Sequence, residues 1–211
     1  DLLKKDWSLD NIKLVCPLDK TTIKALYEAQ GFTVAIRSNK ELIALWPDLK
    51  EKIYGAAIDI GSTTIAINLC NLKDGMIASN QGSMNPQIRF GEDLMSRVSY
   101  CMQNPGSEKK LTKTVRKAIN DLIKKACEHA GLLGNDILEI TIVGNPIMHH
   151  LFLGFDPVPL GVAPFRLKTN KALYLNAKEL EIEITKENLS FDTINQLSDE
   201  LGTLMSTLDE K

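Results

Sequence analysis

Residues 54–64 read YGAAIDIGSTT, and this segment constrains the fold more than any other part of the chain. An apolar run that carries one acid, Asp59, is followed by Gly61, three hydroxyl residues and a second apolar run at 65–69. This order predicts a strand, a tight polar turn and a second strand. Because glycine has no Cβ, such a turn can present several backbone N–H groups to a phosphate.

The side chains around the turn suit the same ligand. The hydroxyls of Ser62, Thr63 and Thr64 are further donors, and the carboxylate of Asp59 can hold a Mg²⁺ ion through water. The turn belongs to a hairpin, unlike the strand-to-helix turn of a Walker A site. An ordinary hairpin is the alternative, since Asp, Gly, Ser and Thr are common in turns.

The remaining pattern predicts an α/β fold with a mixed sheet. Strands are expected at 56–60, 64–72, 76–82 and 137–143, and helices at 91–102, 108–130 and 147–153. Before them, residues 12–46 predict a small β-α-β-β unit, and 47–52 a linker. Three hairpin strands followed by two helices and a fourth strand are typical of a ribonuclease-H-like half-domain, which is half of an actin-like ATPase core. The lysine-rich outer face of 108–130 favours a solvated surface.

Charge and composition exclude several classes of function. The chain has 44% apolar and 25% charged residues with a net charge of −2, so no basic field indicates a nucleic acid or an anionic membrane. No apolar run is long enough to cross a bilayer, and no signal peptide is visible at the first residues. The scattered Cys16, Cys70, Cys101 and Cys127 disfavour a metal site and suit a cytoplasmic protein.

Three blocks carry a resemblance to a known family. They are YGAAIDIGSTT, MNPQIRFGEDLMSRVSY and TIVGNPIMHHLFLGFDPVPLGVAPF, in this order along the chain. Together they resemble the ATPase domain of the reductive activators of corrinoid proteins, which belong to the superfamily of acetate and sugar kinases, heat-shock chaperones and actin. The resemblance covers 53–165 as the first half of that domain. It implies that 1–52 is the end of a middle, linker-type region and that 166–211 is a divergent tail.

The resemblance implies an activity and its partners. Such activators use ATP and Mg²⁺ to help return a corrinoid protein from Co(II) to Co(I). Their [2Fe–2S] cluster is expected only in an N-terminal domain that this sequence lacks. The corrinoid protein is the expected partner of the complete activator.

The resemblance also implies the site residues. The nucleotide-binding positions are Asp59, Gly61, Ser62, Thr63, Thr64, Gly144 and Asn145, with Asp59 also the metal-linked acid. The cleft-lining positions are Asn85, Gln87, Gly91, Arg97 and His149, and the catalytic acids are Asp59, Glu92 and Asp93. For Glu92 and Asp93 the alternative is a favourable charge at a helix N-terminus. A packed or hydrogen-bonded role is the favoured one for His149 and His150, because adjacent helical residues point about 100° apart.

The end of the chain departs from the family pattern. No second phosphate loop of the Asp-x-Gly type follows residue 165, and no closing strand or helix is recognisable there. Instead, 192–208 predicts an amphipathic helix that covers an apolar sheet face near 140–143 or pairs with another chain as a homodimer. We therefore expect a fragment of the activator that is inactive alone. The alternatives are a non-catalytic remnant that binds a protein partner and a small-molecule kinase of the same superfamily.

Overall fold

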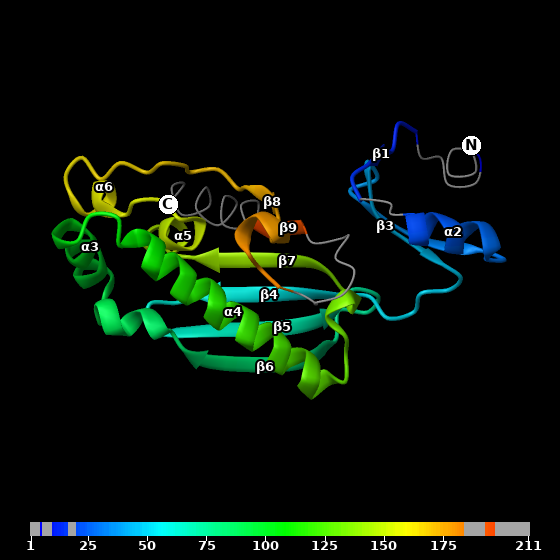
Figure 1. Cartoon of the computed structure of the whole chain (residues 1–211), viewed down its shortest axis with the longest axis horizontal. Helices are drawn as coiled ribbons and strands as arrows, with labels where there is room; N and C mark the ends of the chain where they lie inside the picture. Colours follow the sequence, from blue (N-terminus) through cyan, green and yellow to red (C-terminus); the bar gives the residue numbers. More distant parts are fainter. Residues whose placement is uncertain (1–4, 6–9, 17–19, 184–192, 197–211) are drawn as a thin grey trace, which may run out of the picture.

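Two β-sheets organise the computed structural model of the chain, which describes residues 5, 10–16, 20–183 and 193–196 (Figure 1). The first sheet has three strands in the order β1-β3-β2, and the second has six in the order β6-β5-β4-β7-β9-β8. No helix in these residues is both long enough and apolar enough to span a bilayer.

The first sheet belongs to the small N-terminal unit that the sequence predicts. Its elements are β1 (Lys13–Leu14), α2 (Lys20–Glu28), β2 (Phe32–Arg37) and β3 (Glu41–Pro47). The unit contacts the larger sheet through a small cluster in which Ile43 and Ala44 pack with Leu138. An ion pair of 2.6 Å between Lys50 Nζ and Asp136 Oδ1 adds a polar contact.

The larger sheet is mixed, as expected. Its strands are β4 (Tyr54–Ile60), β5 (Thr64–Asn71), β6 (Ile77–Met84), β7 (Ile137–Gly144), β8 (Tyr174–Asn176) and β9 (Thr193–Gln196). Strands β4, β5 and β6 are antiparallel, which confirms the predicted hairpins. Strand β7 runs parallel to β4, and β9 runs parallel to β7. This arrangement is the ribonuclease-H-like organisation that the sequence predicts.

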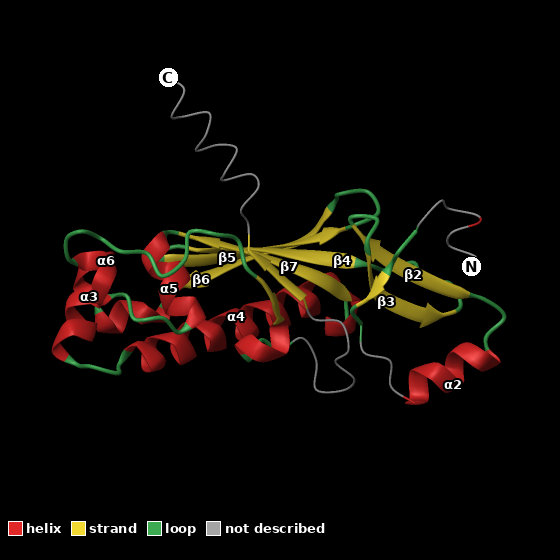
Figure 2. Ribbon diagram, turned by 90° about the horizontal axis from the view of Figure 1, so that it is seen from above, coloured by secondary structure: helices red, strands yellow, loops and turns green. Residues whose placement is uncertain are grey.

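The helices of the larger unit lie between β6 and β7 and after β7 and β8. They are η1 (Pro86–Phe90), α3 (Leu94–Gln103), α4 (Glu108–Ala130), η2 (Gly134–Asp136), α5 (Pro146–Leu153), α6 (Val158–Gly161) and η3 (Ala177–Leu180). Helix α4 lies along one face of the sheet (Figure 2) because its apolar stripe recurs every three or four residues. The stripe is buried at Leu111, Val115 and Ile119, as predicted.

Alternation along the strands separates a buried face from an open one. Ile58 and Ile67 are buried beneath the helices, whereas Ala57, Asp59 and Ala66 point to the opposite face and are exposed. A period of two residues produces this division in every strand that is covered on one side. The acid of the phosphate-turn motif therefore lies on the open face.

The structure corrects the expectations for the end of the chain. Residues 193–196 form strand β9 beside β7, whereas the sequence predicted a helix over 192–208; residues 197–208 lie outside the described residues. Unpaired backbone groups along β7 require a partner, and the β-branched Thr193 and Ile194 suit a strand. The closing strands missed in the sequence are thus β8 and β9.

A further expectation about this region is wrong. Ile140 and Ile142 are buried among the helices, so that face of β7 has its cover. Ala177, Leu180 and Ile182 belong to the same core, so this part of the expected divergent tail packs with the sheet and its helices. The spacing of the residues alone did not reveal this packing, because β8 and η3 are only three and four residues long.

Candidate functional site

The turn at Gly61–Thr63 joins β4 to β5 and closes tightly. The backbone N–H of Gly61 donates to the carbonyl oxygen of Thr64 at 2.9 Å. A Cβ at position 61 would lie 2.7 Å from that oxygen, closer than carbon and oxygen can approach. The close approach of the two strands therefore requires glycine here, as the sequence predicted for a turn that brings backbone to a ligand.

Asn85 holds the turn from beneath. It is fully buried, and its Nδ2 donates to the carbonyl oxygen of Gly61 at 2.8 Å. Its backbone N–H donates to the carbonyl oxygen of Thr63 at 2.7 Å, and its Oδ1 accepts from the backbone N–H of Gln87 at 3.0 Å. One side chain thus fixes both the turn and the start of η1.

Arg97 holds the middle of the same turn. Its guanidinium donates from Nη2 to the carbonyl oxygen of Ser62, and from Nε to the carbonyl oxygen of Gly91 at 3.0 Å. Nη1 lies 3.1 Å from the sulfur of Met148. Arg97 is fully buried and forms no ion pair with a carboxylate of the described residues. Burial lowers its pKa and Asp93 opposes that shift, so the guanidinium is a buried positive charge below the turn.

These contacts orient the peptide groups of the turn. The carbonyl oxygens of Gly61 and Ser62 accept hydrogen bonds from the buried side chains of Asn85 and Arg97, and that of Thr63 accepts from the Asn85 backbone N–H. In a trans peptide the following N–H points the opposite way, so the N–H groups of Ser62 and Thr63 are directed outward. Neither N–H donates to any atom of the described residues. The turn therefore presents at least two backbone donors over a buried cation, as an anion site does.

Asp59 precedes the turn at the end of β4. It lies opposite Ala66 of β5 and Val143 of β7 in the register, and it is exposed. Thr63 and Thr64 are also exposed, and Ser62 is half-buried. The carboxylate and the hydroxyl residues are therefore accessible beside the outward N–H groups.

The other two predicted catalytic acids directly precede α3. Asp93 caps α3: its Oδ1 accepts from the backbone N–H of Ser96 at 2.7 Å, and this hydrogen bond lowers the Asp93 pKa. Glu92 is exposed next to it. No group of three or more His, Cys, Asp or Glu side chains gathers among the described residues. Asp93 thus has the helix-terminal position of the alternative, and the catalytic role of both acids stays a prediction.

Gly144 and Asn145 reach the same edge of the sheet as the turn. Gly144 lies opposite Ile60 in the parallel register, and a Cβ there would lie 3.1 Å from the Ile60 carbonyl oxygen. Asn145 caps α5, because its Oδ1 accepts from the backbone N–H groups of Ile147 and Met148. The structure thus brings these two residues together with the end of β4.

The predicted cleft-lining residues need a correction. Asn85, Gln87 and Arg97 are fully buried, so they support the turn and do not line an open surface. Gln87 Nε2 donates to the carbonyl oxygen of Leu111 at 3.0 Å and ties this layer to α4. Gly91 lies against the same layer, since a Cβ there would lie 2.7 Å from the Arg97 backbone nitrogen. The sequence alone does not show whether a polar residue of a motif faces a ligand or bonds the backbone of a neighbouring segment.

Met148 is the member of this layer that sequence reasoning missed. It is buried, and its sulfur contacts both Arg97 and Asn85 Nδ2, the latter at 3.8 Å. An apolar residue on a short helix carries no signal of such a role. Through it the turn is coupled to α5.

The two histidines of α5 differ in their surroundings. His150 is buried, its Nδ1 lies 2.8 Å from the carbonyl oxygen of Pro146, and its Nε2 accepts from the backbone N–H of Lys168 at 3.0 Å. The favoured packed and hydrogen-bonded role is therefore confirmed for His150. Burial lowers its pKa. His149, predicted to line the cleft, is half-buried.

Known proteins match the chain over most of its length. A model of the family described as the RACo middle region matches residues 54–194. The corrinoid activation enzyme RamQ of Eubacterium limosum is 32% identical over 163 residues, which make up 75% of this chain. The solved structure of a reductive activator for corrinoid, iron-sulfur protein has a TM-score of 0.75 and 27% identity over 92% of this chain.

The chain is much shorter than these two relatives. It covers 28% of RamQ and 32% of the solved reductive activator. The family model begins at residue 54, so residues 1–52 lie outside it. The three sequence blocks that carried the resemblance all lie inside the matched range.

The support of the turn by Asn85 is testable by mutation. Asn85→Ala leaves the carbonyl oxygen of Gly61 buried without its donor, so we expect the free energy of unfolding to fall by about 2 kcal/mol in urea titrations. The matched control is Asn80→Ala, because Asn80 is exposed and bonds only Asn68 among the described residues. The control should change stability by less than about 0.5 kcal/mol. Equal effects of the two substitutions would contradict the supporting role.

The buried His150 predicts a dependence of stability on pH. Its pKa in the folded chain lies below the ordinary 6.5, so below that pH the unfolded state takes up the proton first. The free energy of unfolding should therefore decrease as the pH falls below about 6.5 and level off below the folded-state pKa. His150→Gln should lose this part of the decrease. Thermal melts of both chains between neutral and mildly acidic pH test this prediction. If stability falls equally with pH in the original chain and in His150→Gln, His150 is not the group responsible.

Proposed function

Because the chain belongs to the family of the RACo middle region, we propose that it supplies the first phosphate-binding turn of an ATP-dependent activator of a corrinoid protein. In this proposal the complete protein uses ATP to drive the transfer of one electron, from an iron–sulfur cluster in another of its domains, onto the cobalt of its partner, which passes from Co(II) to Co(I). The relatives named as corrinoid activators support the partner class. The single observation that carries the proposal is the set of outward N–H groups above the buried Arg97.

The turn is suited to phosphate for an electrostatic reason. The N–H groups of Ser62 and Thr63 are donors that need no rearrangement before binding. The carbonyl groups of the same two peptide units, those of Gly61 and Ser62, are already held by hydrogen bonds from Asn85 and Arg97. Arg97 adds a positive charge that forms no ion pair with a carboxylate of the described residues, although Asp93 is close enough to raise its pKa. Oriented donors above a cation stabilise charge that develops on a transferring phosphoryl group. A phosphate on the turn would be the counter-ion of Arg97.

The acid beside the turn fits a magnesium-bound nucleotide. Asp59 is exposed, and no cluster of three ligand side chains surrounds it in the described part of the chain. Mg²⁺ commonly keeps several waters and takes one or two carboxylates together with substrate phosphates. Asp59 would therefore hold the ion through water, and the ion would supply neutralisation of the phosphate charge.

Other parts of the proposed activator lie outside this chain. The second half of the ATP site, with its own phosphate loop, would come from the remaining length of the complete protein. An iron–sulfur cluster does not fit the residues present: all four cysteines are free thiols, and three of them are buried. Burial raises the Cys127 pKa to about 11, which disfavours the thiolate that a cluster needs. The proposed electron donor therefore belongs to another domain.

The nucleotide role of Asp59 is testable in the complete protein that contains this sequence. Asp59→Asn should abolish ATP hydrolysis and the ATP-dependent formation of Co(I), while the melting temperature stays within a few degrees because the side chain is exposed. The matched control is Glu128→Gln, which removes an exposed acid from α4 and should leave both activities intact.

Two outcomes would contradict the proposal. One is an unchanged hydrolysis rate in Asp59→Asn. The other is tight, micromolar binding of ATP by the 211-residue chain alone, because a single turn offers only part of the contacts of an ATP site built from two halves. We expect calorimetry on the isolated chain to show weak binding and no useful turnover.

A further inference from the structure

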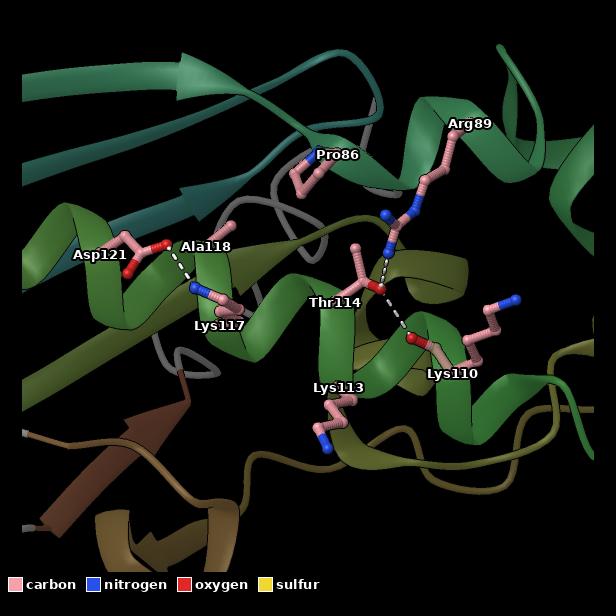
Figure 3. A pocket seen from close by; sticks show the side chains of 8 residues that line it. All are labelled: Pro86, Arg89, Lys110, Lys113, Thr114, Lys117, Ala118 and Asp121. Atoms are coloured by element: carbon pink, nitrogen blue, oxygen red, sulfur yellow. Dashed lines mark hydrogen bonds and ion pairs between the residues drawn. The ribbon is translucent and has the colours of Figure 1, made fainter.

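A basic groove lies between η1 and α4, on the helix-covered side of the sheet (Figure 3). It is a hollow of about 420 Å³. Pro86 and Arg89 of η1 line one side of it, and Lys110, Lys113 and Lys117 of α4 line the other. Asp59 lies on the opposite face of the sheet, and no residue of the turn lines the groove.

Three of the four cations of this basic groove form no ion pair with a carboxylate of the described residues. Lys117 pairs with Asp121 at 3.3 Å, but Arg89, Lys110 and Lys113 form no ion pair with a carboxylate of the described residues. This excess of positive charge stands out in a chain whose net charge is −2. The groove therefore complements an anionic partner.

Two of the cations are held in place. Arg89 Nη2 donates to Thr114 Oγ1 at 2.8 Å, and Figure 3 shows this side chain reaching from η1 to α4. The guanidinium carbon of Arg89 lies 4.7 Å from the centre of the Phe90 ring, and Lys110 Nζ lies 5.5 Å from it. Cation–π contacts of this kind restrict long side chains that would otherwise move freely in water. Less entropy is then lost when a partner binds.

The shape of the groove distinguishes between kinds of anion. Positions 110, 113, 117 and 121 follow one stripe of α4, which extends for about 16 Å at 1.5 Å per residue. A single phosphate requires donors that converge on one point, whereas these cations are spread along a line. Pro86 and Ala118 add apolar surface between them. The line of charges and the apolar contacts suit an extended chain whose carboxylates alternate with an apolar side chain.

We propose that the basic groove binds an acidic, extended segment of a partner protein. The sequence favoured a solvated face for the lysines of α4, but it could not show that Arg89 is brought to them from a separate element. The proposal stands without the nucleotide site, because the two lie on opposite faces of the sheet. The contact would be strongly dependent on salt, as for other exposed charge pairs.

The test uses the full chain and a fluorescein-labelled peptide in which glutamates alternate with leucine and serine. Fluorescence anisotropy should show binding that weakens as salt is added. The double variant Lys110→Glu/Lys113→Glu should weaken binding at least about tenfold. The matched control, Lys124→Glu/Lys125→Glu, makes the same charge change further along α4, and it should stay within about threefold because the affected charges are outside the groove.

Three results would overturn the proposal. The first is an equal loss in the groove and control variants, which would indicate the general field of the helix. The second is equal binding of a peptide with glutamines in place of the glutamates. The third is displacement of the peptide by tripolyphosphate at lower concentration than by unlabelled peptide, which would indicate a small-anion site. Circular dichroism melts confirm that each variant is folded before its binding is compared.

Discussion

The turn between β4 and β5 depends on hydrogen bonds to its carbonyl oxygens from below. Asn85 and Arg97 donate hydrogen bonds to the carbonyl oxygens of Gly61, Ser62 and Thr63. The N–H groups of Ser62 and Thr63 are therefore directed outward. Without these donors, the same Gly-Ser-Thr segment could close as an ordinary hairpin with its peptide groups in other orientations. The rest of the site follows from this constraint, since the sheet positions Asp59 beside the turn and β7 brings Gly144 next to it.

Arg97 connects this turn to the helices around it. Its guanidinium bonds the turn and the Gly91 carbonyl oxygen and contacts Met148 of α5, yet it has no carboxylate partner among the described residues. A buried charge without an ion-pair partner is costly, and perturbed charges of this kind cluster at functional sites. In our account the missing negative charge is a phosphate of the bound nucleotide. Binding would then also stabilise the packing of α3 and α5 around Arg97.

Much of the fold is predictable from local pattern, and the burial of the site is not. The hairpin of β4 and β5 follows from alternation and from one glycine, and α4 follows from its apolar stripe. Strand β9 was predicted as part of a helix, because its pairing with β7 depends on residues far apart in sequence. Asn85 and Arg97 belong to a motif whose sequence indicates a shared site, but only the packing shows that they bond the backbone of the turn. For the same reason the sequence did not indicate Met148, because its contacts with Asn85 and Arg97 depend on the direction of one side chain.

The most direct test of the account is an NMR titration of the isotope-labelled chain with tripolyphosphate and Mg²⁺, following every backbone amide. The account predicts that the Ser62 and Thr63 amide signals shift progressively downfield, as expected for N–H groups that donate to an anion, and that Arg97→Met greatly reduces these shifts in a folded chain. If the two amides do not respond, or if the largest shifts fall on the lysines of α4, the turn is not the phosphate site and the central claim is wrong.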